Sequence, residues 1–230
     1  MEKIFWTMMG LVLSVLIACP VAVSQAQPAK GKYVVMIDPA HGGAETGVSL
    51  TDRYYEKDLV LAVAVTIQKA LEGSDTFQVR LTRSTDKQMS IAERIKKVQE
   101  DHPDLFISLH VNAGFGKSAS GYEVYFPGFS TVPSGQDESA AILTDMTKNK
   151  YLNDSVKVAQ IIQRNLQSVF PRKGRGLRDA DMPILEGLTI PAVVLEIGFA
   201  TNPEDKAALM DAKSQQAIVQ ALIRSIQEFF

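Results

Sequence analysis

From Tyr33 onward, short runs of β-branched and aliphatic residues alternate with longer amphipathic segments, and this alternation restricts the fold more than any other feature. Runs of this kind are typical of buried strands, and the segments between them have the apolar spacing of helices. We therefore predict an α/β fold, a single domain with a twisted, mostly parallel sheet covered by helices on both faces. The predicted strands are 33–38, 77–82, 105–110, 122–126 and 192–197, and the predicted helices are 54–71, 90–100, 153–170, 203–210 and 214–230.

The composition is that of an ordinary globular protein. The chain has 230 residues, of which 46% are hydrophobic and 22% charged, and its net charge is -2. Recognition of nucleic acid would require a basic surplus that this chain lacks. With no internal repeat or low-complexity tract, we expect one domain, and we expect it to be monomeric.

The first 26 residues differ from the rest. A nearly uninterrupted apolar run extends from Ile4 to Val23 and is followed by small and polar residues, Ser24 to Ala26. This pattern predicts a secretory signal peptide over 1–26, followed by a short linker over 27–32 and the folded domain over 33–230. We therefore expect an exported protein of the periplasm or cell wall, although the run is also long enough for an uncleaved membrane anchor.

Cys19 is the only cysteine, so no disulfide can form within the chain. Together with the preceding Leu16, Ile17 and Ala18 it resembles a bacterial lipobox, in which the cysteine is lipid-modified. The alternative is an apolar residue of a leader that is removed. Pro20 directly after Cys19 and the competing cleavage site at Ala26 favour that alternative.

Four residues, each just after or inside an apolar run, form a complete set for zinc chemistry: His41, Glu56, His110 and Glu196. His41, His110 and Glu196 each lie at or near the end of a predicted strand, and the carboxyl ends of parallel strands meet at one edge. Glu56 joins them if the helix near Tyr54 directs its first turn towards that edge. Two imidazoles and a carboxylate can bind Zn²⁺, and a second carboxylate can accept the proton of an attacking water molecule.

Each of these residues also has a structural explanation. A histidine at a strand end is commonly a polar terminus, and Glu56 alone would be an acid favoured by the helix dipole. Glu196 is harder to explain, because a carboxylate inside a buried strand is costly unless it is paired or bound to metal. His102 precedes Pro103 at the opposite end of the strand that leads to His110, so we exclude it from the site.

Several motifs in this order resemble the zinc-dependent N-acetylmuramoyl-L-alanine amidases of bacterial peptidoglycan, amidase type 3. The resemblance covers essentially the whole of the chain after the leader. It rests on IDPAHGG (37–43), EKDLVLAVA (56–64), LTRSTD (81–86), SLHVNA (108–113) and LEIGFATNPED (195–205).

The resemblance implies a function and assigns the residues. His41, Glu56 and His110 would be the ligands of one Zn²⁺ per chain, and Glu196 would be the catalytic carboxylate. The expected reaction is hydrolysis of the amide between the lactyl group of N-acetylmuramic acid and L-alanine, in cell wall remodelling or daughter-cell separation. Two alternatives stay open: a zinc peptidase that acts on another peptidoglycan amide, and a wall-binding regulator without catalysis.

Other polar residues also lie near the predicted strand ends. Asn112 is either a substrate ligand or a turn residue. Arg178 is either a ligand of a substrate carboxylate or a solvated loop cation. Arg83 and Asp86 are expected to form a structural pair.

The segment 127–152 is predicted to be an inserted loop or short helix. Some members of the resembled family carry an insertion here that covers the zinc until a protein activator displaces it. In this chain the segment is short, and we expect it to form the rim of the groove. A second hypothesis is that Asp137 or Glu138 occludes the metal and that an activator acts on the segment.

Overall fold

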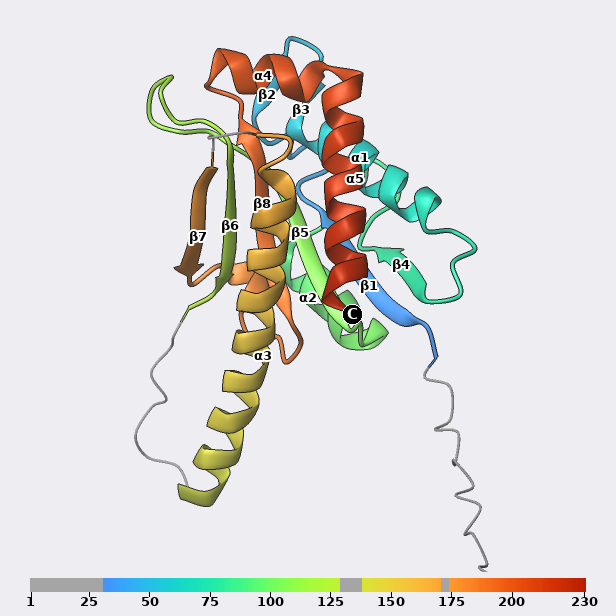
Figure 1. Ribbon diagram of the computed structural model, residues 1–230, viewed down its shortest axis with the longest axis vertical. Coiled ribbons are helices and arrows are strands. Elements are labelled where there is room, and N and C mark those ends of the chain that lie inside the picture. The colour runs from blue at the N-terminus through green and yellow to red at the C-terminus, as the bar shows by residue number, and fades with distance from the viewer. Residues whose placement is uncertain (1–30, 129–137, 171–173) are drawn as a thin grey trace, which may run out of the picture. The chain divides into compact units, whose positions relative to one another are not determined.

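The centre of the described structure is a mixed six-stranded sheet with the strand order β4-β1-β5-β8-β6-β7 (Figure 1). β4, β1, β5 and β8 run parallel, whereas β6 runs antiparallel to β8 and parallel to β7. All five predicted strands are present, with ends that differ by at most two residues from the prediction. The bounds are β1 Tyr33–Pro39, β4 Phe77–Leu81, β5 Leu105–Asn112, β6 Tyr122–Pro127, β7 Gly174–Ala180 and β8 Ala192–Phe199.

β7 and a small hairpin were not predicted. β7 has the sequence GRGLRDA, in which two glycines and two arginines obscure the apolar alternation of a strand. It lies at the edge of the sheet and pairs only with β6. The hairpin, β2 Ser49–Thr51 and β3 Tyr54–Tyr55, directly precedes the first helix.

Five helices and one short 3₁₀ helix surround the described part of the sheet. Three of them begin at polar side-chain caps: the Ser90 side chain accepts from the Glu93 amide at the start of α2, and Asn202 and Asp211 cap α4 and α5 in the same way. The bounds are α1 Glu56–Ala70, α2 Ile91–Asp101, α3 Glu138–Leu166, η1 Pro183–Leu185, α4 Pro203–Met210 and α5 Ala212–Phe229.

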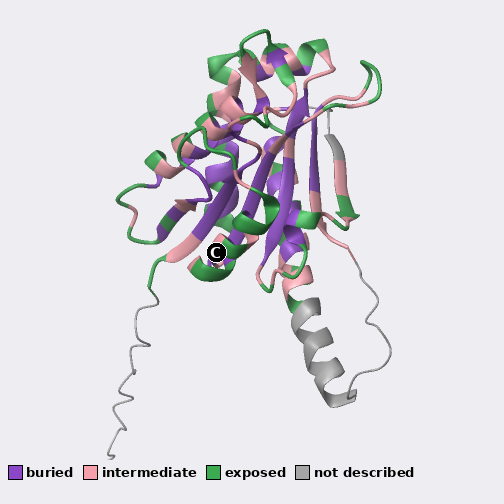
Figure 2. Cartoon of the chain, turned by 180° about the vertical axis from the view of Figure 1, so that it is seen from behind, coloured by how far each residue is buried: buried purple, intermediate pink, exposed green. Residues whose placement is uncertain are grey.

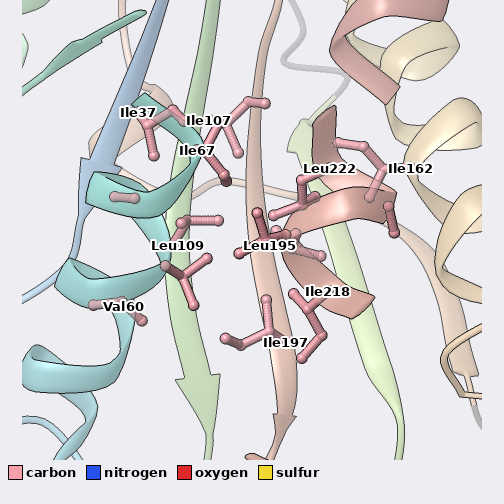
Figure 3. Close-up of a cluster of buried hydrophobic side chains, with 14 of the residues drawn as sticks. Ile37, Val60, Ile67, Ile107, Leu109, Ile162, Leu195, Ile197, Ile218 and Leu222 are labelled. Atoms are coloured by element: carbon pink, nitrogen blue, oxygen red, sulfur yellow. The ribbon is translucent and has the colours of Figure 1, made fainter. Parts of the chain in front are cut away.

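The two faces of the sheet bury separate apolar clusters, because alternate strand residues point to opposite sides. On one face, strand residues such as Ile107 and Leu195 pack against α1, α3 and α5 (Figure 3). On the other face, Met36 and Phe106 pack against Val98 of α2 and against η1. The central strands are consequently buried almost throughout (Figure 2), and the prediction of helices on both faces is confirmed.

α3 begins 15 residues before the predicted helix start at Asn153. The hydroxyl of Ser155 accepts the amide N–H of Ala192, the first residue of β8, so Ser155 lies level with the start of that strand. From there α3 ascends along the sheet, and Tyr122 donates to the carbonyl of Gln163. At about 1.5 Å per residue, Glu138 lies about 25 Å below Ser155, beyond the edge at which β8 begins (Figure 1).

The computed structural model describes residues 31–128, 138–170 and 174–230. The predicted leader over 1–26, with Cys19, and Asp137 lie outside the described residues. Residues 32–230 form one compact unit. Among the described helices, none has the length and apolarity needed to cross a membrane.

Candidate metal centre

His41 follows β1 in a loop that two buried arginines hold in place. Arg83 donates to the carbonyl oxygens of Pro39 and Ala40 at 2.9 and 2.8 Å, and Arg94 donates to that of His41 at 2.6 Å. The φ angle of His41 is 59°, in the left-handed region that residues other than glycine rarely adopt. These hydrogen bonds therefore hold the backbone of His41 in a conformation that it would not favour alone.

A buried carboxylate lies beneath this loop and fixes Arg94. Asp38 on β1 accepts a hydrogen bond from Arg94 at 2.5 Å and from the hydroxyls of Thr82 and Ser108 at 2.5 and 2.8 Å. Charge-assisted bonds of this kind satisfy both buried ions. The network connects the His41 loop to β4, β5 and α2.

Three side chains from different elements converge at the carboxyl edge of the sheet. His41 Nε2 lies 3.1 Å and His110 Nδ1 3.2 Å from Oε1 of Glu56. The ligand atoms all lie within 4.8 Å of one another. Ligands of tetrahedral zinc, with bonds of about 2.1 Å, are about 3.4 Å apart, so this donor set fits the ion in both spacing and chemistry.

Further contacts orient the three side chains. Nδ1 of His41 lies 2.8 Å from Oε1 of Glu45, which leaves Nε2 to face Glu56. The carboxylate of Glu56, the first residue of α1, accepts the amide N–H groups of Val48 and Val111 at 3.0 and 2.9 Å. A carboxylate on the outer nitrogen of a histidine is a common feature of metal sites.

Gly47 lies directly against two of the three side chains. A Cβ atom at this position would lie 2.4 Å from Oε2 of Glu56 and 2.7 Å from Cδ2 of His41. Its φ of 66° is also one that glycine adopts without cost. A side chain here would displace the metal-binding groups.

The charges of Glu56 and His41 are coupled. Burial alone would raise the pKa of Glu56, but hydrogen bonds to His110 and His41 lower it to about 2. The hydrogen bond to Glu56 raises the pKa of His41 above its ordinary value, despite burial that lowers it. In the metal-free site, a proton on His41 and the buried charge of Glu56 thus stabilise each other.

Glu196 lies beside His110 on the neighbouring strand β8, in direct register with it. Burial, opposed by the nearby His110 and reinforced by Glu56 and Glu123, raises the pKa of Glu196 to about 7. Its Oε2 atom is buried without a hydrogen-bond partner in the structure. A buried carboxyl group in this state can exchange a proton near neutral pH.

A second buried carboxylate, Glu123 on β6, lies in register with Glu196 on its other side. One oxygen of Glu123 accepts from the Asn112 side-chain amide and the Tyr125 hydroxyl at 2.7 and 2.9 Å. The other lies 3.1 Å from Nε of Arg178 on β7. Burial and the hydrogen bond to Glu123 raise the pKa of Tyr125 to about 12, so this tyrosine stays a donor.

The comparison with known proteins agrees with this geometry. A family model described as N-acetylmuramoyl-L-alanine amidase matches residues 35–228, nearly the whole described domain. The chain belongs to the N-acetylmuramoyl-L-alanine amidase family. This amidase domain is 30% identical to the uncharacterized protein YqiI of Bacillus subtilis over 99% of this chain and 98% of that protein.

Two further relatives carry the family name. The chain is 26% identical to the N-acetylmuramoyl-L-alanine amidase AmiC of Escherichia coli over 92% of its own length, but it spans only 57% of AmiC. The crystal structure of N-acetylmuramoyl-L-alanine amidase from Clostridium difficile 630 superimposes with a TM-score of 0.73 at 27% identity, over 87% of this chain and 97% of that one.

The structure of this amidase domain brings the four predicted residues His41, Glu56, His110 and Glu196 to one edge and keeps His102 away from it. His102 ends α2 before β5 begins. Sequence reasoning missed Glu45 and Glu123. The only signal for Glu123 was an acid within the apolar run YEVYF, the same signal that identified Glu196.

Two interpretations of polar residues need correction. Arg178 is not in a loop but in the edge strand β7, while Asn112 does end its strand, with its amide bound to Glu123, and its role as a substrate ligand stays a prediction. Arg83 was expected to pair with Asp86, whereas Asp86 forms an ion pair with Lys57 at 2.7 Å. Arg83 instead donates to the buried backbone carbonyls of Pro39 and Ala40.

Proposed function

We propose that this protein is a zinc-dependent hydrolase that cleaves the amide between N-acetylmuramic acid and L-alanine in peptidoglycan. The observation that carries the proposal is the convergence of two imidazoles and a carboxylate beside Glu196, a buried carboxyl group with an unpartnered oxygen. Membership of the amidase family supports the choice of bond.

His41, Glu56 and His110 would bind the ion through Nε2, a carboxylate oxygen and Nδ1. When bound, Zn²⁺ would polarise the scissile carbonyl and make a water molecule acidic enough to attack near neutral pH. The three side chains leave one tetrahedral position for substrate or water.

Glu196 would move the proton. Its carboxylate would accept a proton from the attacking water and then deliver it to the nitrogen of the leaving alanine. The buried position of Glu196 keeps bulk water from competing for this proton. Its neighbour Glu123 accepts from Asn112 and Tyr125 and lies beside Arg178, and we assign it no proton transfer.

The test is digestion of purified sacculi by the protein loaded with zinc, with released products identified by mass spectrometry. We expect free stem peptides that begin with alanine and no cuts between amino acids. His41→Ala should lose the metal and the activity, and Glu196→Gln should keep the metal and lose activity by about 10²- to 10⁴-fold. His102→Ala is the matched control and should retain both.

The same digest distinguishes the alternatives. New amino termini inside the stem peptide would support a zinc peptidase instead. Wall binding without any release of peptide would support a regulator, although the complete residue set at the metal centre favours catalysis. We also propose export to the periplasm or cell wall, a monomer in solution, and peptidoglycan as the partner.

A further inference from the structure

The polar side chains at the metal centre form a row across the sheet, and this row continues onto the next two strands, β6 and β7. His110, Glu196 and Glu123 are direct register neighbours on β5, β8 and β6. Arg178 lies on the next strand, β7, in register with Tyr125. The side chains of all five of these residues point to the same face of the sheet. Further from the metal centre, α2 and η1 cover this face, and Val124 and Leu195 point to the opposite face.

Glu123 holds Arg178 in a specific way. The carboxylate is 3% exposed, and one of its oxygens lies 3.1 Å from Nε of Arg178, whereas the other accepts from Asn112 and Tyr125. The side chain of Arg178 is 45% exposed. Among the described residues, no hydrogen bond engages its two terminal nitrogens. An arginine held through Nε keeps its two-pronged end for another planar anion.

We propose that Arg178 binds a carboxylate of the stem peptide and that Glu123 is the positioning residue that orients it. This inference rests on the function proposed above. It specifies the substrate further: the enzyme prefers a stem peptide whose second residue carries a free carboxylate to one in which that group is a carboxamide.

The spacing of the sheet supports the second residue. Neighbouring strands are about 4.8 Å apart, so the backbones of β8 and β7 are about 10 Å apart across β6. The long side chain of Arg178 extends from β7 to Glu123 and covers much of that interval. A peptide chain advances about 3.5 Å per residue. A group on the residue after the alanine can therefore reach the part of this interval that the Arg178 side chain does not cover.

The experiment uses the zinc-loaded enzyme and two disaccharide–tripeptides that differ only in that one group, carboxylate or carboxamide. We expect the wild type to cleave the carboxylate substrate with a kcat/KM about 10- to 100-fold higher, the range of a charge-assisted pair. Arg178→Ala should lose this preference through a higher KM for the carboxylate substrate, with little change for the carboxamide. Arg178→Lys should recover part of it.

Glu123→Gln should also reduce the preference, because it removes the charge that orients Arg178. The matched control is Arg164→Ala, which removes an exposed arginine that pairs with Glu228 between α3 and α5, on the other face of the sheet. Zinc content and thermal unfolding establish that each variant is folded and loaded.

Equal losses of Arg178→Ala on both substrates, or a preference that survives the substitution, would overturn the inference and leave the proposed function intact. If the wild type cleaves neither substrate at the alanine amide, the proposed function itself is wrong.

Discussion

Two buried glutamates at the metal centre have pKa values displaced in opposite directions. Two imidazoles hold Glu56 ionised, with a pKa lowered to about 2, whereas burial raises the pKa of Glu196 to about 7. Their carboxylates come from the start of a helix and from a buried strand. The two residues are of the same type, so their environments separate a carboxylate that stays ionised from one that can exchange a proton near neutral pH.

The raised pKa of Glu196 makes the stability of the metal-free protein depend on pH. Between its ordinary value of 4.5 and about 7, the folded protein binds a proton that the unfolded chain has released. The contribution of this proton to the free energy of unfolding is therefore fully present below pH 4.5 and is lost as the pH rises through 7. At about 1.4 kcal/mol per pKa unit, the loss is up to about 3 kcal/mol.

Comparison with Glu196→Gln isolates this effect, because all other titrating groups are shared. We expect the variant to gain stability relative to the wild type between pH 5 and pH 8, in urea unfolding of protein treated with chelator. A stability difference that is the same at both pH values would contradict the assignment.

Gly47 offers a second prediction at the same scale. Gly47→Ala places a Cβ atom against Glu56 and His41, so we expect zinc affinity to fall by at least about 10-fold, measured by chelator competition. Gly73→Ala is the matched control, since Gly73 also has a positive φ, of 80°, but no atom lies within 4 Å of the added Cβ. Both variants lose about 1 kcal/mol to backbone strain, and only the first should lose zinc. Equal zinc affinities would exclude this role for Gly47.

At the residue scale, the sequence was sufficient for those side chains whose surroundings are unusual. Glu196 stands in an apolar run, His41 follows β1, and His110 lies near the end of β5. The partners Glu45 and Glu123 could not be assigned, because their contacts with His41 and Arg178 depend on how loops and neighbouring strands meet. Arg83 shows the same limitation, since buried carbonyls of the His41 loop compete with Asp86 for its donors.

At the scale of elements, the central parallel strands were predictable and the reversed pair was not. β1, β5 and β8 are buried on both faces and read as continuous apolar runs. The direction of β6 leaves no trace in its own sequence, and β7 lacks a strand pattern. The segment before Asn153 was predicted as an inserted loop or short helix, and its continuity with α3 was missed.

The direction of β6 decides what the 127–152 segment can do. β6 runs away from the metal centre, and α3 begins beyond the opposite edge of the sheet. α3 therefore begins on the side of the sheet away from the metal centre, which does not favour a place at the rim of the groove. Occlusion of the metal by Asp137 or Glu138 stays a hypothesis, and Asp137 lies outside the described residues. A protein activator that binds α3 stays a proposal, and it would act at that far edge.

Replacement of 130–148 by a short glycine–serine linker tests this directly. We expect activity on sacculi to stay within about twofold of the wild type, since α3 still packs through Val158 and Ile162. A large gain in activity would show inhibition by the segment and contradict the geometry. Thermal unfolding of the same sample verifies that the domain is intact.

At the scale of the whole molecule, the two edges of the sheet serve different purposes. The carboxyl edge collects the polar site, whereas an aromatic cluster closes the amino edge around the end of the chain. The ring of Phe230 stacks on Tyr33 of β1 with centroids 4.1 Å apart and lies 5.9 Å from Phe77 of β4. The last residue thus joins α5 to the first strands.

Phe230→Ala should lower the stability of the domain without changing its chemistry. We expect a loss of about 1–2 kcal/mol, or about 3–6 °C in Tm for a domain of this size, with unchanged zinc content and turnover. Phe115→Ala removes a fully exposed phenylalanine and serves as the control, with no expected shift. A loss of zinc in Phe230→Ala would show that the two edges are not independent.

The reversal between β8 and β6 also provides a place for protein engineering. The chain leaves β6 at Pro127 and re-enters the described structure at Glu138, both on the side away from the metal centre. A wall-binding module or fluorescent reporter inserted between these two residues would be attached on the side of the sheet away from the metal centre. Different modules could then be inserted while the residues of the metal centre keep their geometry.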